Sequence, residues 1–380
     1  MKVLYLISVL APAGAEQSLV AMAPCLSKLG VEVTVAYLRE RPGLHARLEE
    51  VGIEVVSLTG RGGAMRRFLR TVRLIRDRQP DVVHTTLTEA NIIGRLAASL
   101  TRAPVVSSLV NVSYGPEQLA APTGSTFGVR VRHLLDLATA RLVVRFHAVT
   151  TTVAQIMARR LHVPAQRIDV VPRGRDPEQF GRRSQARRAK ARAELGVPGD
   201  APLVLAVAHQ DYQKGLDVLV AAMALVREKR PRARLVVAGR AGNHTDELRH
   251  LVARLHLDES VSFLGLRDDI PELLSAADVF VLASRWEGMG GVLLEAMLLE
   301  APIVASDLAT LRDAVPDERH GLLVPPEQPE ALASAVLAVL DDPEAASRRA
   351  VLARARVLER FTVERVAEEM LTFYERALGA

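Results

Sequence analysis

The sequence predicts two doubly wound, Rossmann-like α/β domains that face each other across a cleft. Short apolar runs typical of buried strands alternate with segments of helical periodicity, which is the pattern of a mainly parallel sheet. The alternation stops at a basic, helix-compatible stretch, residues 181–202, and then starts again. The chain of 380 residues, 49% of them apolar, is long enough for two domains with separate cores.

Each half of the chain contains six apolar runs that we interpret as strands. They lie at residues 2–9, 31–38, 53–58, 81–86, 104–109 and 168–172, and at residues 203–208, 234–239, 261–265, 278–284, 302–306 and 321–325. The domains are therefore predicted at residues 1–175 and 176–360. Because ligands of doubly wound sheets bind outside the carboxyl ends of the strands, we expect the site in the cleft.

Charge and cysteine content bear on partners and compartment. Residues 1–193 hold 29 Lys and Arg against 14 Asp and Glu, whereas residues 194–380 hold 20 against 30. This asymmetry fits either a basic domain facing an acidic surface or arginine-rich, solvated helix faces. Cys25 is the only cysteine, no run reaches the ~20 apolar residues of a membrane span, and the N-terminus lacks a signal-peptide cleavage pattern. From these absences we expect a cytoplasmic protein.

Two functional classes are disfavoured. Aromatic residues make up only 4% of the chain and few lie among the arginines, so nucleic acid is not an expected partner. The loop after the first predicted strand, "SVLAPAGAE", lacks the Gly-x-Gly-x-x-Gly pattern of a dinucleotide-binding oxidoreductase.

The stretch "SRWEGMGGVLLEAMLLEAPIVAS", residues 284–306, is the strongest candidate site. It predicts a turn after a buried strand and then an apolar helix that begins near Gly290. The backbone N–H groups and positive dipole of a helix N-terminus suit a diphosphate. Glu287 lies in the turn and Glu295 lies on the helix, where a carboxylate could bind a ribose diol. The alternative is that Glu287 caps the helix and Glu295 is a partly exposed helix residue.

This stretch resembles the Glu-x7-Glu region of retaining glycosyltransferases of the glycogen-synthase-like GT-B type, family 4 in particular. The resemblance extends along nearly the whole chain and includes "APAGAEQSL", "VVPRGRDPEQF", "AVAHQDYQKGLDVLVAA" and the terminal helix "FTVERVAEEMLTFYERAL". It implies sugar transfer from a nucleotide diphosphate sugar, with UDP favoured over GDP, to a hydroxyl of a glycan, lipid-linked or small-molecule acceptor. It also implies that residues 361–380 cross back to the N-terminal domain.

The resemblance implies a role for particular residues. The catalytic candidates are Glu287 near the donor sugar, Lys214 on the diphosphate and Gly14 in the early glycine loop. The implied donor-binding residues are Glu295 on the ribose and the backbone of Met289, Gly290 and Gly291. No Asp-x-Asp metal motif is present, so we expect no metal and no cofactor, and we expect Lys214 and the helix N-terminus to stabilise the leaving group.

Three departures from the family pattern bear on the predicted site, and a fourth, Glu300 in place of a common glycine, bears on the end of the helix that carries Glu295. Ala208 and His209 replace the usual Gly-Arg, so a positive charge there depends on histidine protonation. The interdomain motif reads Arg173-Gly174-Arg175-Asp176 instead of Asn-Gly-Val-Asp, and either arginine could replace the missing phosphate contact or be a solvated hinge residue. Asn111 stands where many members have a histidine near the donor sugar. These departures keep open a second hypothesis, a pseudo-enzyme that binds nucleotide sugars or glycans.

Two further features remain ambiguous. His84 lies at a strand end and matches a frequent family position, but a buried histidine there is more often structural. Residues 61–80 predict a basic amphipathic helix, with Met65, Phe68, Leu69, Val72 and Ile75 on one face and arginines elsewhere. Either this is an ordinary surface helix, or its arginines dock the N-terminal domain on anionic lipid at the inner membrane face.

Overall fold

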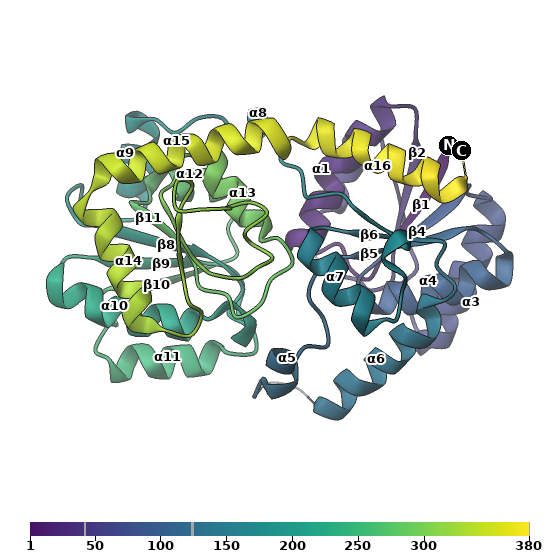
Figure 1. The fold of residues 1–380 in the computed structure, drawn as a ribbon, viewed down its shortest axis with the longest axis horizontal. Coiled ribbons are helices and arrows are strands. Elements are labelled where there is room, and N and C mark those ends of the chain that lie inside the picture. Colours follow the sequence, from purple (N-terminus) through teal and green to yellow (C-terminus); the bar gives the residue numbers. More distant parts are fainter. Residues whose placement is uncertain (42, 123–124, 380) are drawn as a thin grey trace. The chain divides into compact units, whose positions relative to one another are not determined.

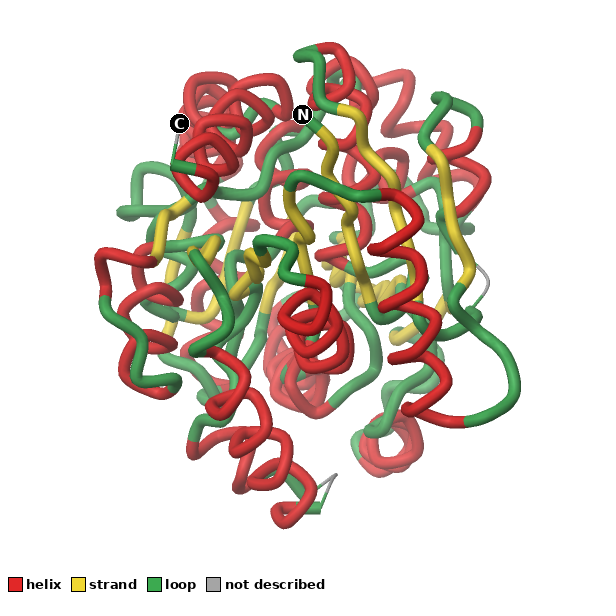
Figure 2. Tube along the Cα trace, turned by 90° about the vertical axis from the view of Figure 1, so that its right-hand side faces the viewer, coloured by secondary structure: helices red, strands yellow, loops and turns green. Residues whose placement is uncertain are grey.

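The computed structural model describes residues 1–41, 43–122 and 125–379, so Ala380, the last residue of the predicted terminal segment, lies outside the described residues. The chain divides into two compact units. Unit 1 comprises Met1–Leu119, Ser125–Asp176 and the segment from Phe361 onward, and unit 2 comprises Pro177–Arg360 with a short segment that begins at Ala120. Figures 1 and 2 show the strands of each unit with helices packed around them.

Unit 1 is a doubly wound parallel sheet with the strand order β3-β2-β1-β4-β5-β6-β7. Its strands are β1 (Lys2–Ile7), β2 (Glu32–Tyr37), β3 (Glu54–Ser57), β4 (Val82–Thr86), β5 (Val105–Leu109), β6 (Arg145–Ala148) and β7 (Ile168–Val170). Its helices are α1 (Gly14–Lys28), α2 (His45–Glu49), α3 (Gly63–Arg78), α4 (Thr88–Thr101), α6 (Thr126–Ala140), α7 (Thr151–Arg160) and α16 (Val363–Leu378); α5 (Pro116–Ala120) ends where the short segment of unit 2 begins.

Strand β6 was not among the predicted strands, because polar residues interrupt its apolar run. Inside the sheet those residues have partners. Arg145 donates to Asp169 Oδ2 at 2.6 Å, and His147 Nε2 donates to the Val171 carbonyl at 2.8 Å. Because these polar side chains have hydrogen-bond partners, the segment can form a nearly buried strand.

Unit 2 is a second doubly wound parallel sheet, with the order β10-β9-β8-β11-β12-β13. Its strands are β8 (Leu203–Val207), β9 (Arg234–Ala238), β10 (Val261–Gly265), β11 (Val279–Leu282), β12 (Ile303–Ser306) and β13 (Leu322–Val324). Its helices are α8 (Pro177–Phe180), α9 (Gln185–Glu194), α10 (Leu216–Lys229), α11 (Thr245–Arg254), α12 (Ile270–Ala276), α13 (Gly291–Leu298), α14 (Pro329–Asp341) and α15 (Pro343–Arg360). All six strands predicted for this half of the chain are present.

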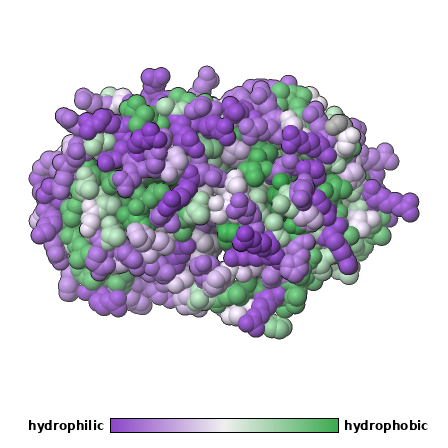
Figure 3. Space-filling view, viewed as in Figure 1, coloured by the Kyte–Doolittle hydropathy of each residue, from purple (hydrophilic) through white to green (hydrophobic). Residues whose placement is uncertain are grey.

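The two sheets are buried by Val-, Leu- and Ala-rich cores of their own. Polar side chains cover much of the face shown in Figure 3, with apolar patches between them. None of the helices among the described residues is both long enough and apolar enough to cross a bilayer.

The last helix, α16, packs against α1 at the start of the chain, and Figure 1 shows these two helices beside each other. Met370, Phe373 and Tyr374 of α16 are buried in the core of unit 1. The Arg175 N–H donates to the Phe361 carbonyl at 2.9 Å, and the Val363 N–H donates to the Arg175 carbonyl at 3.0 Å. The chain therefore returns to the first unit at its end.

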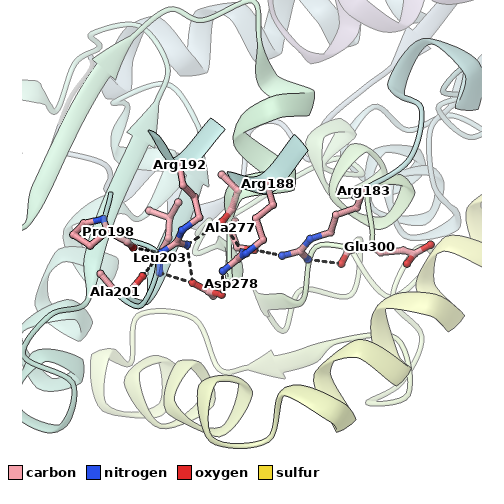
Figure 4. Close-up of polar contacts among 10 residues, drawn as sticks. Arg183, Arg188, Arg192, Pro198, Ala201, Leu203, Ala277, Asp278 and Glu300 are labelled. Atoms are coloured by element: carbon pink, nitrogen blue, oxygen red, sulfur yellow. Dashed lines mark hydrogen bonds and ion pairs between the residues drawn. The ribbon is translucent and has the colours of Figure 1, made fainter. Parts of the chain in front are cut away.

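Arginines from the basic stretch before β8 are structural in this fold (Figure 4). Arg188 and Arg192 on α9 both bond the carboxylate of Asp278, at 2.6 and 3.1 Å, just before β11. Arg183 donates to the Glu300 carbonyl at 2.9 Å. These three guanidinium groups are therefore paired and not simply solvated. They hold α9 and the preceding loop against the rest of unit 2.

Candidate functional site

Lys214 and Glu287 form an ion pair in unit 2 at the point where the strand order reverses. The η2 turn (Tyr212–Lys214) follows β8, and the loop with Glu287 follows β11, the strand next to β8. The side chains are 21% and 8% exposed, and the Ser284 hydroxyl also donates to Glu287 Oε1 at 2.9 Å. The crevice outside the carboxyl ends of two such strands is the usual ligand site of a doubly wound sheet.

The two loops press closely against each other. Gly215 follows Lys214 with a φ of +59°, and a Cβ there would lie 2.1 Å from the Ala283 carbonyl oxygen, so only glycine fits. The Arg285 N–H donates to the Gln213 carbonyl at 2.8 Å, and the Gln213 amide donates to the Trp286 carbonyl at 2.7 Å. The residues on either side of Lys214 thus contact the segment just before Glu287. These contacts hold the ammonium and the carboxylate near each other.

Arg285 is a residue that the sequence analysis missed. Its guanidinium bonds Asp217 at 2.9 and 2.7 Å and the Tyr212 carbonyl at 2.7 Å, and it lies 3.9 Å from the centre of the Tyr212 ring. Its side chain is only 8% exposed. Asp217 is in the first turn of α10, so Arg285 ties the loop with Glu287 to the loop and helix that follow β8. An arginine directly after the predicted strand, with an acid three residues after Lys214, is the only sequence signal for this contact.

Helix α13 begins where the sequence predicted. Gly290 is its N-cap with a φ of +68°, and Gly291 is its first residue. Gly290 has no side chain that could cap the helix, and the Glu287 carboxylate contacts Lys214 and Ser284. Met289 is fully buried, and Glu295 is half-buried in the second turn of α13. The Lys214 ammonium lies in the loop after β8, and the N-terminus of α13 follows the loop after the adjacent strand, β11. Two such groups suit an anionic ligand.

His209 lies after β8 in the same unit. Burial, together with the charges of Arg240 and Lys214, lowers the pKa of His209 to about 4. The imidazole is therefore neutral near pH 7 and does not replace the positive charge that the family pattern has there. Among the described residues, no group of three or more His, Cys, Asp or Glu side chains is placed to hold a metal ion.

The remaining predicted residues, Gly14, Asn111 and Arg173, belong to unit 1. Gly14 is the first residue of α1, and the Asn111 Oδ1 accepts the Val112 N–H at 2.8 Å. Arg173 and Arg175 are 8% and 4% exposed, so the prediction of a solvated hinge arginine is wrong. The backbone of Arg175 is paired with Phe361 and Val363 at the start of α16.

His84 is fully buried and structural, as favoured from the sequence. Its Nδ1 lies 2.7 Å from the Tyr374 hydroxyl, and its Nε2 lies 2.7 Å from the Ser108 hydroxyl, which contacts His147 Nδ1 at 2.8 Å. Because His147 Nε2 must donate to the Val171 carbonyl, its Nδ1 must accept from Ser108. Ser108 then accepts from His84, and His84 accepts from Tyr374. In this series of hydrogen bonds, every donor has an acceptor when both histidines are neutral. Burial favours the neutral state, because it lowers the pKa of both rings.

Two family models match the chain in succession. The model described as Glycosyltransferase Family 4 matches residues 12–179, and the model described as Glycosyl transferases group 1 matches residues 187–356. The two matches fall in the first and second halves of the chain, and the second contains both Lys214 and Glu287.

Curated relatives agree with these matches. The D-inositol 3-phosphate glycosyltransferase of Kineococcus radiotolerans is 33% identical over 327 residues, which are 80% of this chain and 73% of the relative. The 2-deoxystreptamine glucosyltransferase of Streptomyces kanamyceticus is 30% identical over 304 residues, which are 77% of this chain and 78% of the relative.

Solved structures support the fold. HepE from Anabaena, in complex with UDP-glucose, superimposes with a TM-score of 0.88 at 23% identity and covers 99% of this chain and 100% of its own. Sucrose-phosphate synthase from Thermosynechococcus elongatus gives 0.83 at 22% identity and covers 100% of both chains. The prediction of two Rossmann-like domains of the GT-B type is confirmed.

Proposed function

Because the chain belongs to the family 4 glycosyltransferases, we propose that it transfers a sugar from a UDP-sugar to a hydroxyl of a glycan, lipid-linked or small-molecule acceptor, with retention of the anomeric configuration. The observation that carries the proposal is the Lys214–Glu287 pair at the switch point of unit 2, beside the N-terminus of α13. A relative in Escherichia coli, 27% identical, is named for UDP-Gal, and HepE was solved with UDP-glucose, which supports UDP as the nucleotide.

In the proposed mechanism the donor diphosphate binds at the backbone of Met289, Gly290 and Gly291, and Glu295 holds the ribose. Lys214 stabilises the charge that develops on the diphosphate as the bond from the anomeric carbon to the phosphate oxygen breaks. The acceptor oxygen forms its new bond on the same face of the sugar. Its proton passes to the departing phosphate oxygen, so UDP leaves protonated and the enzyme is unchanged.

Protein groups supply the positive charge in this mechanism, so it uses neither a metal ion nor a cofactor. The ammonium of Lys214 is a compact cation on a flexible stem, which can follow the leaving oxygen. Glu287 pairs with that ammonium in the absence of donor. In the proposed mechanism it contacts the donor sugar once Lys214 turns to the diphosphate. Gly14 is the residue of unit 1 whose backbone we propose to approach the donor.

A pseudo-enzyme that binds nucleotide sugars or glycans is the second candidate, and it is favoured by the departure at His209, because burial lowers the pKa of this imidazole and leaves it without a charge for the diphosphate. The two candidates differ in turnover. UDP-sugars and GDP-sugars should first be screened by thermal shift, since a ligand at 100 times its Kd stabilises the folded state by ~2.7 kcal/mol. Release of UDP from the stabilising donor should then be measured for the wild type and for Lys214→Ala. Stabilisation without turnover would favour the binding module, and no stabilisation by any nucleotide sugar would refute the donor site.

We also propose that unit 1 contacts anionic membrane through a basic and apolar face on α3, α4 and α6. The structure changes which residues form it. Arg67 is only 17% exposed and pairs with Glu89 at 2.9 Å, and Arg70 is half-buried and donates to backbone carbonyls, so we leave both out of this face. Met65 and Leu69 were assigned to the apolar face of this helix, but they are 68% and 56% exposed and are therefore not part of the core. The exposed residues that we assign to this face are Met65, Arg66, Leu69, Arg73, Arg76, Leu100, Phe127, Arg130 and Leu134.

Liposome flotation tests this contact. Each arginine near an anionic surface contributes ~1 kcal/mol, and the attraction is screened within ~8 Å at physiological salt. Flotation should therefore require anionic lipid, weaken with salt, and fall in an Arg66→Glu, Arg73→Glu, Arg76→Glu variant. Equal recovery with neutral vesicles, or recovery with neither, would leave these helices as ordinary surface.

A further inference from the structure

The loop after β5, residues 110–115, contains Asn111. It lies at the carboxyl end of an inner strand of the sheet in unit 1, the edge at which doubly wound sheets bind ligands. The Asn111 Oδ1 accepts the Val112 N–H at 2.8 Å, so the position of that donor fixes which way the amide faces. The NH2 group of Asn111 is then the part of the side chain that can donate to a ligand.

The backbone of this loop is strained at Tyr114. Its φ is +66°, in the left-handed region that residues other than glycine seldom adopt. The Tyr114 N–H donates to Gln118 Oε1 at 2.7 Å. Arg160 on α7 donates to the neighbouring Ser113 carbonyl at 2.5 Å. Strained residues persist only where their surroundings hold them, and they gather at active sites and ligand clamps, so the groups that hold Tyr114 bear on the function of the loop.

Helix α6 holds the side chain of Tyr114, which is buried. The Tyr114 hydroxyl donates to Asp136 Oδ2 at 2.8 Å, and its ring stacks on that of His133 with the two centroids 4.6 Å apart. Burial and the negative charge of Asp136 raise the pKa of the hydroxyl, so it stays protonated and donates. Tyr114 is therefore fixed by a hydrogen bond at the far end of its side chain.

The Asp136 carboxylate is in turn held by Arg95 on α4. The side chain of Arg95 is fully buried and that of Asp136 is 6% exposed. Arg95 Nη1 donates to Asp136 Oδ1, and Arg95 Nε donates to the Ser107 hydroxyl on β5 at 2.9 Å. The two carboxylate oxygens thus take one bond each from Arg95 and from Tyr114, and they connect α4 and β5 to the loop.

Stability alone does not account for this buried ion pair. Apolar side chains of similar volume are often as stabilising, because both ions of a buried pair must be desolvated. The Nη2 of Arg95 is also buried without a hydrogen-bond partner among the described residues, which adds to the free-energy cost. What Arg95 and Asp136 provide, and apolar residues could not, is a fixed carboxylate oxygen for the Tyr114 hydroxyl.

We propose that Tyr114, Asp136 and Arg95 are positioning residues of the transfer reaction, because they hold the loop of residues 110–115 where the Asn111 NH2 donates to a hydroxyl of the transferred sugar. The inference rests on the proposed function, in which UDP carries that sugar. Arg95 places the carboxylate, and Tyr114 passes its position to the backbone near Asn111. The three residues act on the orientation of the sugar and leave the binding of UDP to unit 2.

The test is the kcat of UDP release by the full chain, with the UDP-sugar that the thermal-shift screen selects, together with the Kd of UDP from calorimetry. Tyr114→Phe should lower kcat about ten- to a hundredfold, because a displacement near 1 Å at the reacting groups has up to that effect. The Kd of UDP should be unchanged, since the residues proposed to bind UDP lie in unit 2.

A double-mutant cycle with Asn111→Ala separates positioning from a loss of stability. Because Tyr114 acts through Asn111, the two substitutions together should lower kcat no further than Asn111→Ala alone. The pair is tested with Arg95→Met and Asp136→Leu in one variant, which leaves no unpaired ion. That variant should have the kcat of Tyr114→Phe.

Tyr374→Phe is the matched control, since it removes another buried tyrosine hydroxyl of unit 1, 2.7 Å from His84 Nδ1. It should lower Tm about as much as Tyr114→Phe does and keep the kcat of the wild type. A wild type that releases no UDP from any UDP-sugar would refute the proposed function and, with it, the sugar contact. An active wild type would overturn the inference alone if Tyr114→Phe matches Tyr374→Phe in kcat, or if the effects of Tyr114→Phe and Asn111→Ala multiply.

Discussion

Replacing Arg285 with alanine should loosen the active-site loops of unit 2 without removing any residue proposed to touch the donor. The substitution deletes two hydrogen bonds to Asp217, one to the Tyr212 carbonyl, the stacking on the Tyr212 ring and the 3.0 Å ion pair with the exposed Glu327. It also leaves the Asp217 carboxylate, 27% exposed, without its main counter-charge. The loops of Glu287 and Lys214 would then lose the side-chain contacts of Arg285 and keep only the hydrogen bonds through Gln213 and the close approach at Gly215.

The size of the effect follows from burial. Breaking a fully buried ion pair destabilises by about 3–5 kcal/mol, and partial access of water to Asp217 reduces this to about 2–3 kcal/mol. For a unit of this size each kcal/mol shifts Tm by about 2–4 °C, so we expect a fall of about 5–10 °C. A displacement near 1 Å at the site lowers transfer by up to about a hundredfold. Arg285→Lys should recover part of both losses, because it restores the charge but not the bidentate fork.

The pH dependence of this pair gives a second readout. Burial opposes ionisation of Asp217, but the hydrogen bonds and charge of Arg285 outweigh it and lower the pKa of this carboxyl. The contribution to stability is therefore present above the unfolded pKa near ~3.9 and is lost as the pH falls through the lower folded pKa. The difference in stability between wild type and Arg285→Ala should be constant near neutral pH and shrink in acid.

Thermal unfolding and UDP release measure the two effects. Arg312→Ala is the control, because Arg312 makes a similar two-pronged contact with Asp307 at 2.8 and 2.7 Å on the exposed surface of the same unit. That variant should behave like the wild type. If Arg285→Ala has the Tm and the kcat/KM of the wild type, the reasoning about the clamp is refuted.

Three further predictions concern the site and the buried network. Glu295→Gln should weaken UDP binding while Lys214→Ala mainly lowers kcat, because the partner of the lysine gains charge in the transition state; negligible change in both variants would remove the site assignment. Chelators should leave transfer intact, and loss of activity that Mg²⁺ or Mn²⁺ restores would contradict this. Burial lowers the pKa of His147 to about 4, so its contribution to stability, on the order of 3 kcal/mol, should be present above ~6.5 and disappear as the pH falls toward 4. The free energy of unfolding, measured between pH 4 and 7, should fall by that amount in the wild type and by less in His147→Asn.

The sequence by itself predicted the fold class and most of the strands, because a strand buried on both faces must be a short apolar run whatever its neighbours are. It also predicted the start of α13 near Gly290. These features depend on residues a few positions apart, so the local pattern is sufficient.

Tertiary structure decided the features that depend on a distant partner. Strand β6 contains Arg145 and His147, which the sheet accepts only because Asp169, Ser108 and Val171 lie beside them. Arg285 looks like any loop arginine until the fold places it against Asp217. A charged side chain carries no local signal of whether it will be solvated or paired, because the free energy of burying it is set by groups that only folding brings near.

For the same reason, the environments of several arginines were predicted wrongly from the sequence. Arg173 and Arg175 were expected to be solvated or on the donor phosphate, and the fold buries both on Ser18. Arg67 was expected to face outward, and the fold pairs it with Glu89. The sequence identifies how many charges the chain carries and where they lie along it, but only the packing of helices and loops determines which of them remain available to bind a ligand or a membrane.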